Sequence, residues 1–262
     1  MQLFDTHAHL DQPEFDADRV EVIGRARAAG VAHVLSVAID AKSSAATIAL
    51  AEHNEGLAAA VGIQPNYGAE AQPGDWEVIC GLASHPRVVA IGETGLDRHW
   101  DYTPFDVQRE LFARHIEIAR QQRLPIVIHC REAADDLMPM LRDAARVAPL
   151  RGVMHAFSGD ANLVAECVAL GLHISFAGPV TYTNKSLDAL RDAARAVADD
   201  RLLIETDSPY LVPHPLRGKQ KRNEPALLVH VAQRLADVRG VSLETLAEQT
   251  TRNAQDLFRR EG

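Results

Sequence analysis

The chain has 262 residues, 47 % of them hydrophobic, and carries 27 Lys and Arg against 36 Asp and Glu, which gives a formal net charge of −9. This length suits one (β/α)8 domain, which typically takes about 250 residues. The negative charge argues against a protein coated with basic surface for general nucleic-acid binding, and the absence of any run of about 18 apolar residues argues against a membrane span.

Short apolar segments rich in β-forming residues alternate with amphipathic helical segments along the chain. The predicted strands are residues 2–5, 31–39, 57–63, 88–93, 125–129, 151–155, 173–177 and 202–205. Residues 105–122 and 132–146 are examples of the helical segments between them. Strands that alternate with helices pair in parallel through right-handed crossovers, and eight such units predict an α/β fold of the (β/α)8 TIM-barrel type.

The end of the chain predicts one helix more than the barrel needs. After the eighth helix, at about residues 225–238, the segment 243–258 again has helical spacing, and we expect it to pack against the barrel. No linker or low-complexity stretch divides the sequence. We therefore expect a single (β/α)8 domain over residues 1–262 with an extra C-terminal helix.

Six His, Glu and Asp side chains fall where the predicted strands end. They are His7, His9, Glu93, His129, His155 and Asp207. In a parallel barrel the carboxyl ends of the strands open onto one face, where catalytic groups collect. Bringing six such groups together would be costly without a cation to neutralise and order them. The pattern therefore predicts a metal centre.

The pair His7 and His9 is the sharpest local signal, because residues i and i+2 of a strand point to the same side. Alone, such a pair is equally well explained by hydrogen-bonded core histidines. Six ligands exceed the three that a catalytic zinc usually takes, so we expect two ions about 3.5–4 Å apart. His7, His9 and Asp207 would serve one ion, and His129 and His155 the other, with Glu93 bridging them.

Five segments resemble the TatD family of metal-dependent deoxyribonucleases, part of the amidohydrolase-like group of metal barrels. They are FDTHAHLD (4–11), AIGETGLD (90–97), IHCREA (128–133), HAFSG (155–159) and LIETDSPYL (203–211). The resemblance continues to TTRNAQDLF (250–258). It implies the same six metal ligands and a Mg²⁺-dependent nuclease, often an exonuclease that works from the 3′ end of DNA.

The chain departs from this family in one loop. The family commonly has a compact RGKxNxP-like segment after the eighth strand, whereas here the stretch reads RGKQKRNEP (217–225), about two residues longer. Lys219 is a candidate for substrate binding. The longer loop leaves open whether Lys219, Lys221 or Arg222 approaches the substrate.

Catalytic and substrate-binding roles follow from charge and position. Asp207 is the expected general base as well as a ligand, although it could be a ligand only, and Glu93 is the second expected catalytic residue. Arg131 lies two residues after His129, and its planar fork suits a phosphate oxygen, unless it pairs with a carboxylate. Arg98 could reach a phosphate or lie in solvent.

Asp5 and Glu205 lie two residues before His7 and Asp207. Each is a candidate for orienting metal ligands from outside the coordination sphere. Glu205 could equally pair with Arg131.

The leading functional hypothesis is phosphodiester hydrolysis by a water held between two metals, as in a 3′–5′ DNase that acts on a single-stranded DNA end. The main alternative is hydrolysis of an amide, a lactone or the ester of an aminoacyl-tRNA. Many relatives with paired metals bridge them with a carbamylated lysine at the end of the fourth strand, but here that position is Glu93, and no lysine lies between Lys42 and Lys185. The least favoured alternative is a binding protein with a structural metal, whose site would be closed by four ligands.

Ligand chemistry and family resemblance suggest different metals. We expect Mg²⁺ or Mn²⁺ to support turnover, yet four imidazoles suit Zn²⁺ or another transition metal better, so the purified protein could carry one. Three cysteines without a CxxC pair fit a reducing cytoplasm, and the first predicted strand begins at Gln2, leaving no room for a signal peptide. A monomer with no membrane partner is the favoured state.

Overall fold

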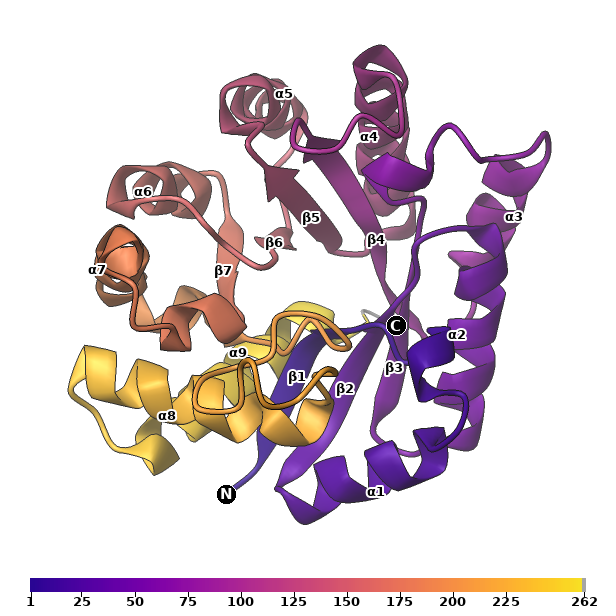
Figure 1. Ribbon diagram of the computed structural model, residues 1–262. Coiled ribbons are helices and arrows are strands. Elements are labelled where there is room, and N and C mark those ends of the chain that lie inside the picture. Colours follow the sequence, from indigo (N-terminus) through magenta and orange to yellow (C-terminus); the bar gives the residue numbers. More distant parts are fainter. Residues whose placement is uncertain (261–262) are drawn as a thin grey trace. The chain divides into compact units, whose positions relative to one another are not determined.

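The computed structural model describes residues 1–260, in which strands and helices alternate along the chain (Figure 1). The strands are β1 (Leu3–Ala8), β2 (Val31–Val37), β3 (Leu57–Val61), β4 (Val88–Asp97), β5 (Ile126–Arg131), β6 (Gly152–Met154), β7 (Leu172–Phe176) and β8 (Leu202–Ile204). The α-helices are α1 (Arg19–Ala28), α2 (Ala41–His53), α3 (Asp75–Leu82), α4 (Phe105–Gln122), α5 (Ala134–Val147), α6 (Ala161–Ala169), α7 (Asp188–Ala196), α8 (Leu228–Arg239) and α9 (Leu243–Phe258). One sheet holds the strands in the order β1 to β8, which confirms the predicted (β/α)8 class.

The chain forms two compact units. The first unit comprises Met1–Ser36, His155–Ala169 and His173–Asp256, and the second comprises Val37–Met154, Leu170–Leu172 and the described residues from Leu257 onward. A single domain over residues 1–262, of which the last two lie outside the described residues, remains a proposal. Among residues 1–260, no helix is long and apolar enough to cross a bilayer.

In the first unit, the chain after β8 runs alongside β1. β7 pairs with β8 in parallel, and Ala8 forms a parallel bridge with Ser208. Two backbone hydrogen bonds hold this contact, from Asp207 N to His7 O at 2.9 Å and from His9 N to Ser208 O at 2.7 Å. The polar residues that follow both strands are thereby brought together.

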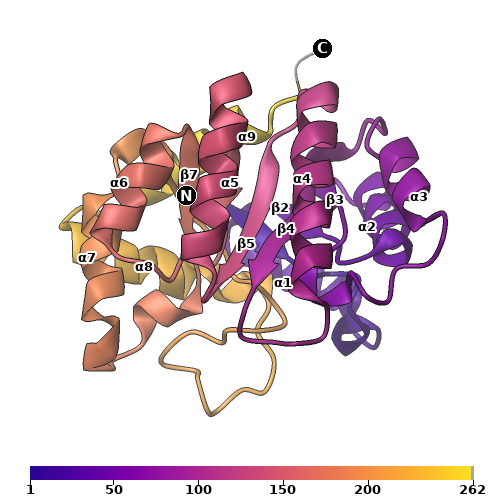
Figure 2. The same ribbon diagram turned by 90° about the horizontal axis from the view of Figure 1, so that it is seen from above.

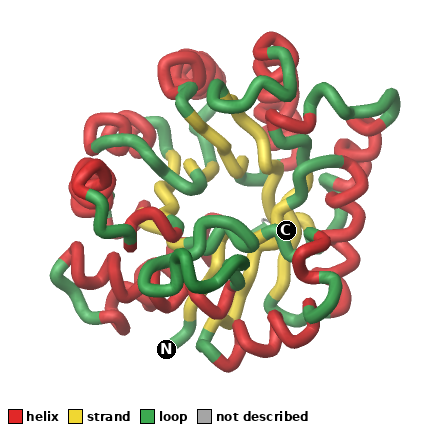
Figure 3. The backbone as a smooth tube through the Cα atoms, viewed as in Figure 1, coloured by secondary structure: helices red, strands yellow, loops and turns green. Residues whose placement is uncertain are grey.

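The predicted C-terminal helix is present as α9. Its Asn253 side chain donates to the carbonyl oxygens of Asp199 and Leu202, at 2.8 and 2.9 Å, and Thr251 donates to the carbonyl of Gln2 at 3.0 Å. These bonds fasten α9 to the starts of β1 and β8 within the first unit. Most of the segment between β8 and α8 is loop (Figure 3).

In the second unit, β3, β4, β5 and β6 pair in parallel, and α4 and α5 lie alongside β4 and β5 (Figure 2). Helix α4 buries a stripe at helical spacing that includes Leu111, Phe112 and Ala119. Full burial of each large apolar side chain contributes about 1.5–3 kcal/mol. The helix ends at Gln122 and is capped by Arg123, whose φ of 55° lies in the left-handed region typical of helix ends.

Strand β4 is longer than predicted. It continues beyond residue 93 to Asp97, because its pairing with β5 resumes after a register shift between Ile91 and Thr94 and reaches Asp97 opposite Arg131. Glu93 therefore lies inside β4 rather than at its end, and Asp97 joins it on the same strand. At the other extreme, β6 and β8 have three residues each, so His155 and Asp207 lie in the loops just beyond them.

Candidate metal centre

The first unit contains a cluster built on β1. His7 lies on this strand and His9 follows it directly, and both side chains are buried. Their Nε2 atoms lie 3.2 Å apart, as the same-side rule for residues i and i+2 predicts. Two buried ring nitrogens that face each other form half of a typical divalent-metal site.

Asp207 completes this pair from the loop after β8. Its Oδ1 lies 3.7 Å from Nε2 of His7 and 3.5 Å from Nε2 of His9. Its φ of 55° is left-handed, a conformation that Asp tolerates better than most residues. Burial raises the pKa of Asp207, but the hydrogen bond from His9 and the charges of His7 and His155 outweigh it and hold the pKa below its usual value. Asp207 is therefore ionised at neutral pH.

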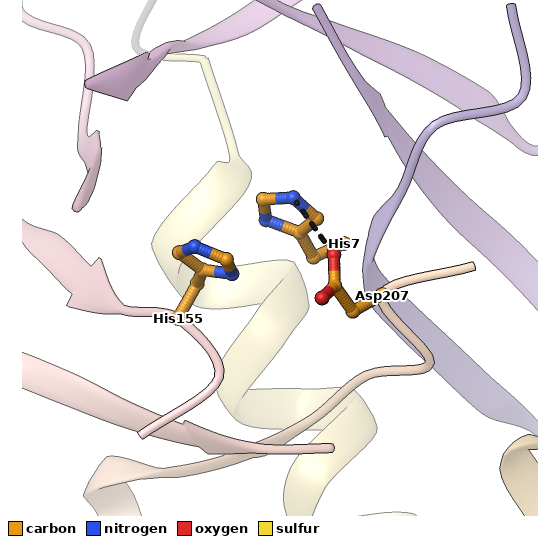
Figure 4. A group of neighbouring side chains, drawn as sticks. All are labelled: His7, His155 and Asp207. Atoms are coloured by element: carbon orange, nitrogen blue, oxygen red, sulfur yellow. Dashed lines mark ion pairs between the residues drawn. The ribbon is translucent and has the colours of Figure 1, made fainter. Parts of the chain in front are cut away.

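His155 joins the same cluster from the loop after β6 (Figure 4). Its ring stacks on that of His7, with centroids 4.0 Å apart and planes inclined by 14°. His7, His155 and Asp207 can each offer a ligand atom within 4.8 Å of the others. Two nitrogens and one carboxylate oxygen suit a divalent first-row metal, so the donor set of the first unit fits the predicted ion.

Two buried carboxylates, those of Glu205 and Asp5, lie next to this cluster. Glu205 Oε1 accepts a 2.6 Å hydrogen bond from Ala156 N and lies 3.4 Å from Nδ1 of His155. Glu205 is therefore placed to orient His155, as the sequence suggested.

Asp5 contacts Thr206 and the backbone of His7 rather than an imidazole ring. Its carboxylate accepts from Thr206 Oγ1 at 2.6 Å, Thr206 N at 2.9 Å and His7 N at 3.3 Å. These bonds tie β1 to the segment that carries Asp207. Burial raises the pKa of Asp5 to about 7, although the hydrogen bonds from Thr206 and His7 oppose that shift.

The second unit contains a cluster centred on His129 of β5. Its Nδ1 lies 2.8 Å from Oε1 of Glu93, and its Nε2 lies 2.8 Å from Oδ2 of Asp97. A histidine that binds a metal through one ring nitrogen commonly donates the N–H of the other ring nitrogen to a carboxylate. Sequence reasoning missed Asp97, although it is the last residue of the AIGETGLD segment.

Further hydrogen-bond partners stabilise the ionised form of the Asp97 carboxylate. Burial raises the pKa of Asp97. Hydrogen bonds from the His129 ring, the Trp100 backbone N–H and the Asn66 side chain outweigh burial and hold this pKa well below the usual range. Asn66 Nδ2 donates to Oδ2 of Asp97 at 3.0 Å. The ionised carboxylate therefore accepts a hydrogen bond from the ring of His129 and fixes its orientation.

The predicted substrate-binding residues differ in whether another side chain of the protein already pairs with them. Arg131 is exposed at the end of β5, with its guanidinium 5.6 Å from the centroid of Trp100. Arg98 forms a two-pronged pair with Asp136, at 2.6 and 2.9 Å. Lys219 is exposed in the loop between β8 and α8.

Arg222, from the same loop as Lys219, is engaged elsewhere. It forms a two-pronged pair with Asp18, at 2.7 and 2.8 Å, and donates to the carbonyl of Glu14. Arg98 and Arg222 thus hold carboxylates of the chain itself, whereas Lys219 forms no ion pair within residues 1–260.

Comparisons with known proteins point to metal-dependent hydrolases. The sequence model of the family described as TatD related DNase matches residues 4–259. The uncharacterized metal-dependent hydrolase YabD of Bacillus subtilis is 40 % identical over 257 residues, covering 98 % of this chain and 99 % of YabD. The 3′-5′ ssDNA/RNA exonuclease TatD of Klebsiella pneumoniae is 36 % identical over 258 residues, covering 98 % and 97 %. The crystal structure of YjjV, a TatD homolog from Escherichia coli K12, superposes with a TM-score of 0.91 at 30 % identity, covering 98 % and 97 %.

Proposed function

The chain belongs to the TatD family of metal-dependent hydrolases, and on that premise we propose that it hydrolyses phosphodiester bonds at the 3′ end of single-stranded DNA. The proposal extends to this chain the activity for which relatives such as the Klebsiella pneumoniae exonuclease are named. The observation that carries it is the convergence of His7, His9, His155 and Asp207 in the first unit. A cation held there would attract and polarise an anionic phosphodiester.

We infer that two divalent ions serve the reaction. The first would be held by His7, His9 and Asp207, and the second by His129 and His155, with Glu93 shared between them. The 2.8 Å contact of Glu93 Oε1 with Nδ1 of His129 supports the pairing of these two residues in this assignment. When bound, such ions supply Lewis acidity toward a phosphoryl oxygen and lower the pKa of a water molecule.

The protein's own groups would orient the reactants and move the proton. Asp207, ionised and close to two imidazoles, is suited to accept the proton of the attacking water. Asp97 would hold the ring of His129 in one orientation, as Glu205 would hold His155. Arg131 and Lys219, both exposed, are suited to bind phosphate oxygens.

Magnesium or manganese is the proposed working ion, and zinc a competent occupant. Imidazole nitrogens favour transition metals, whereas carboxylate oxygens accept Mg²⁺ and Mn²⁺. Metal analysis of the protein as purified, followed by removal of the metal and addition of each ion, would identify which ion restores turnover.

A substrate panel tests the reaction itself. The metal-loaded protein is incubated with 5′-labelled single-stranded DNA, duplex DNA, RNA, a small phosphodiester, a lactone and an aminoacyl ester. We expect single-stranded DNA to shorten one nucleotide at a time from its 3′ end. An Asp207→Asn protein purified in parallel shows whether a contaminating nuclease is responsible. Turnover of the lactone or the aminoacyl ester without cleavage of any phosphodiester would refute the proposal.

A further inference from the structure

Two large aromatic side chains lie stacked and exposed next to the cluster of the second unit. Trp100 is 42 % exposed and Tyr102 59 %, and their rings are nearly parallel, with centroids 5.3 Å apart and planes inclined by 9°. Folding gains little by leaving two such rings in water, and exposed apolar surface of this kind often marks an interaction site. Parallel aromatic faces are the surfaces on which unpaired nucleobases stack.

The loop that carries these rings is anchored to the cluster of the second unit that is centred on His129. Oδ1 of Asp97 accepts hydrogen bonds from His99 N at 2.8 Å and from Trp100 N at 3.0 Å. The other oxygen, Oδ2, lies 2.8 Å from Nε2 of His129. One carboxylate therefore fixes both a proposed metal ligand and the start of the aromatic loop.

The far end of the loop is also fixed. Oγ1 of Thr103 accepts a hydrogen bond from Ala69 N at 3.1 Å, and its carbonyl accepts from Gln108 Nε2 at 3.0 Å. A loop held at both ends presents its rings with little conformational entropy left to lose on binding. The stack is thus a preorganised surface rather than a pair of loose side chains.

A cation lies close to the stack. The guanidinium of Arg131 lies over the ring of Trp100, 5.6 Å from its centroid, and Arg131 is the register partner of Asp97 in the β4–β5 pairing. Because Arg98 is held by Asp136, Arg131 is the better-placed arginine for a phosphate. An aromatic stack with a guanidinium close to it matches the two parts of a nucleotide, its base and its phosphate.

We propose that Trp100 and Tyr102 form a stacking subsite for an unpaired base of the substrate strand, with Arg131 on the adjoining phosphate. The assignment rests on the proposed function and adds the feature that selects single strands. Bases within a duplex have their faces covered by their neighbours, so only an unpaired base can stack on the rings. Because every base has a π-face, the subsite tolerates any sequence.

Fluorescence tests the subsite without turnover. The chain has two tryptophans, Trp76 and Trp100, so Trp76→Phe leaves Trp100 as the only indole and Trp100→Phe is the matched control. Each variant is titrated with a short single-stranded oligonucleotide in EDTA, which prevents cleavage. We expect saturable quenching in Trp76→Phe, little in Trp100→Phe, and little with a blunt duplex or an abasic strand. Equal quenching in the two variants, or quenching by a proline-rich peptide instead of the oligonucleotide, would overturn the assignment.

Kinetics give a second, independent readout. Loss of one ring should raise KM for single-stranded DNA roughly tenfold, since stacking on one aromatic side chain accounts for about that factor, and should change kcat little. The variants are Trp100→Ala and Tyr102→Ala, and Trp100→Phe should restore much of the affinity. Hydrolysis of an abasic phosphodiester should be unchanged in all three.

The two proposals fail in different ways. If the wild-type protein cleaves single-stranded DNA but Trp100→Ala keeps its KM and its preference for base-bearing over abasic strands, the subsite is refuted and the proposed function stands. If the wild-type protein cleaves no phosphodiester, the proposed function is refuted, and the subsite falls with it because it has no substrate strand to bind.

Discussion

The Nε2 atoms of His7 and His9 lie 3.2 Å apart in a buried part of the first unit. At that distance at most one of the two nitrogens can carry a hydrogen along their common line, and the other must present a lone pair. In place of that hydrogen bond, a divalent cation would be held by both nitrogens in their deprotonated form. The nearby Asp207 carboxylate adds the negative charge that such an ion favours.

Metal binding should therefore stabilise the folded protein. A ligand at about 100 times its Kd adds about 2.7 kcal/mol to the free energy of unfolding. We expect Mn²⁺ or Zn²⁺ to raise Tm, and His9→Gln to reduce that rise strongly at the same metal concentration. His230→Gln, a histidine of α8 outside the cluster, should behave as wild type. An unchanged metal-induced shift in His9→Gln would mean that this pair does not bind the ion.

Replacing the proposed base should remove activity and keep the fold. Asp207→Asn loses the negative charge that accepts a proton, and general-base groups contribute roughly 10²–10⁴-fold to rates. We expect kcat on single-stranded DNA to fall by at least that factor with an unchanged circular dichroism spectrum. Asp192→Asn, an exposed carboxylate on α7, serves as the matched control. A loss of activity below tenfold would exclude Asp207 as the base.

Glu93→Ala should abolish turnover while the protein stays folded. The apolar core holds a chain of this size, so neither the Glu93 carboxylate nor a bound metal should be needed for folding. Circular dichroism and thermal unfolding of the variant, and of the wild type after metal removal, check this expectation. A metal-free protein that proved unfolded would show the ions to be structural and would contradict the mechanism.

The basic loop after β8 should contribute to binding rather than to chemistry. Lys219→Gln with Lys221→Gln should raise KM more than it lowers kcat, because such contacts stabilise ground and transition states alike. Arg222→Gln should instead lower Tm, since Arg222 holds Asp18. With few phosphates contacted, KM should rise with salt less steeply than for proteins with about 6–10 phosphate contacts. A steep salt dependence that survives the double substitution would indicate an extended basic groove.

His115 of α4 should make the second unit less stable in acid. Its Nε2 accepts from Ile63 N at 2.9 Å and its Nδ1 lies 2.6 Å from Leu111 O, so the folded state holds it neutral. Burial lowers its pKa from 6.5 to about 4, so the stability that it contributes is complete above pH 6.5 and is lost as pH falls toward 4. The loss amounts to about 3 kcal/mol at most.

Urea unfolding between pH 7 and pH 4 measures this effect. The free energy of unfolding of His115→Gln should vary less with pH than that of wild type, even if the variant is less stable throughout. His53→Gln, which replaces an exposed histidine on α2, should keep the wild-type slope. Equal slopes for wild type and His115→Gln would show that His115 is not the titrating group.

The sequence pattern predicted the fold and most of the cluster residues because they depend on local periodicity. His7 and His9 share a side because a strand repeats every two residues, and the alternation of strands and helices determines the class. Asp97 was not predicted because the length of β4 depends on a register shift against β5. The local pattern of apolar residues carries no information on that shift.

Contacts between residues far apart in the sequence explain the other features that the sequence did not predict. Arg98 and Arg222 have the residue type expected of phosphate ligands, but Asp136 and Asp18 engage them, and only the folded chain brings these partners together. The stack of Trp100 on Tyr102 likewise depends on a turn fixed by the Asp97 side chain. Such engagement by distant partners decides which cations and rings remain for a substrate.

The most direct test of the central claim is anomalous diffraction from crystals soaked in Mn²⁺. Two peaks about 3.5–4 Å apart are expected. One should lie about 2.0–2.2 Å from ligand atoms of His7, His9 and Asp207, the other at similar distances from His129 and His155, with Glu93 oxygens reaching both. A map in which Glu93 lies more than about 4 Å from every ion, well beyond that ligand distance, would contradict the account.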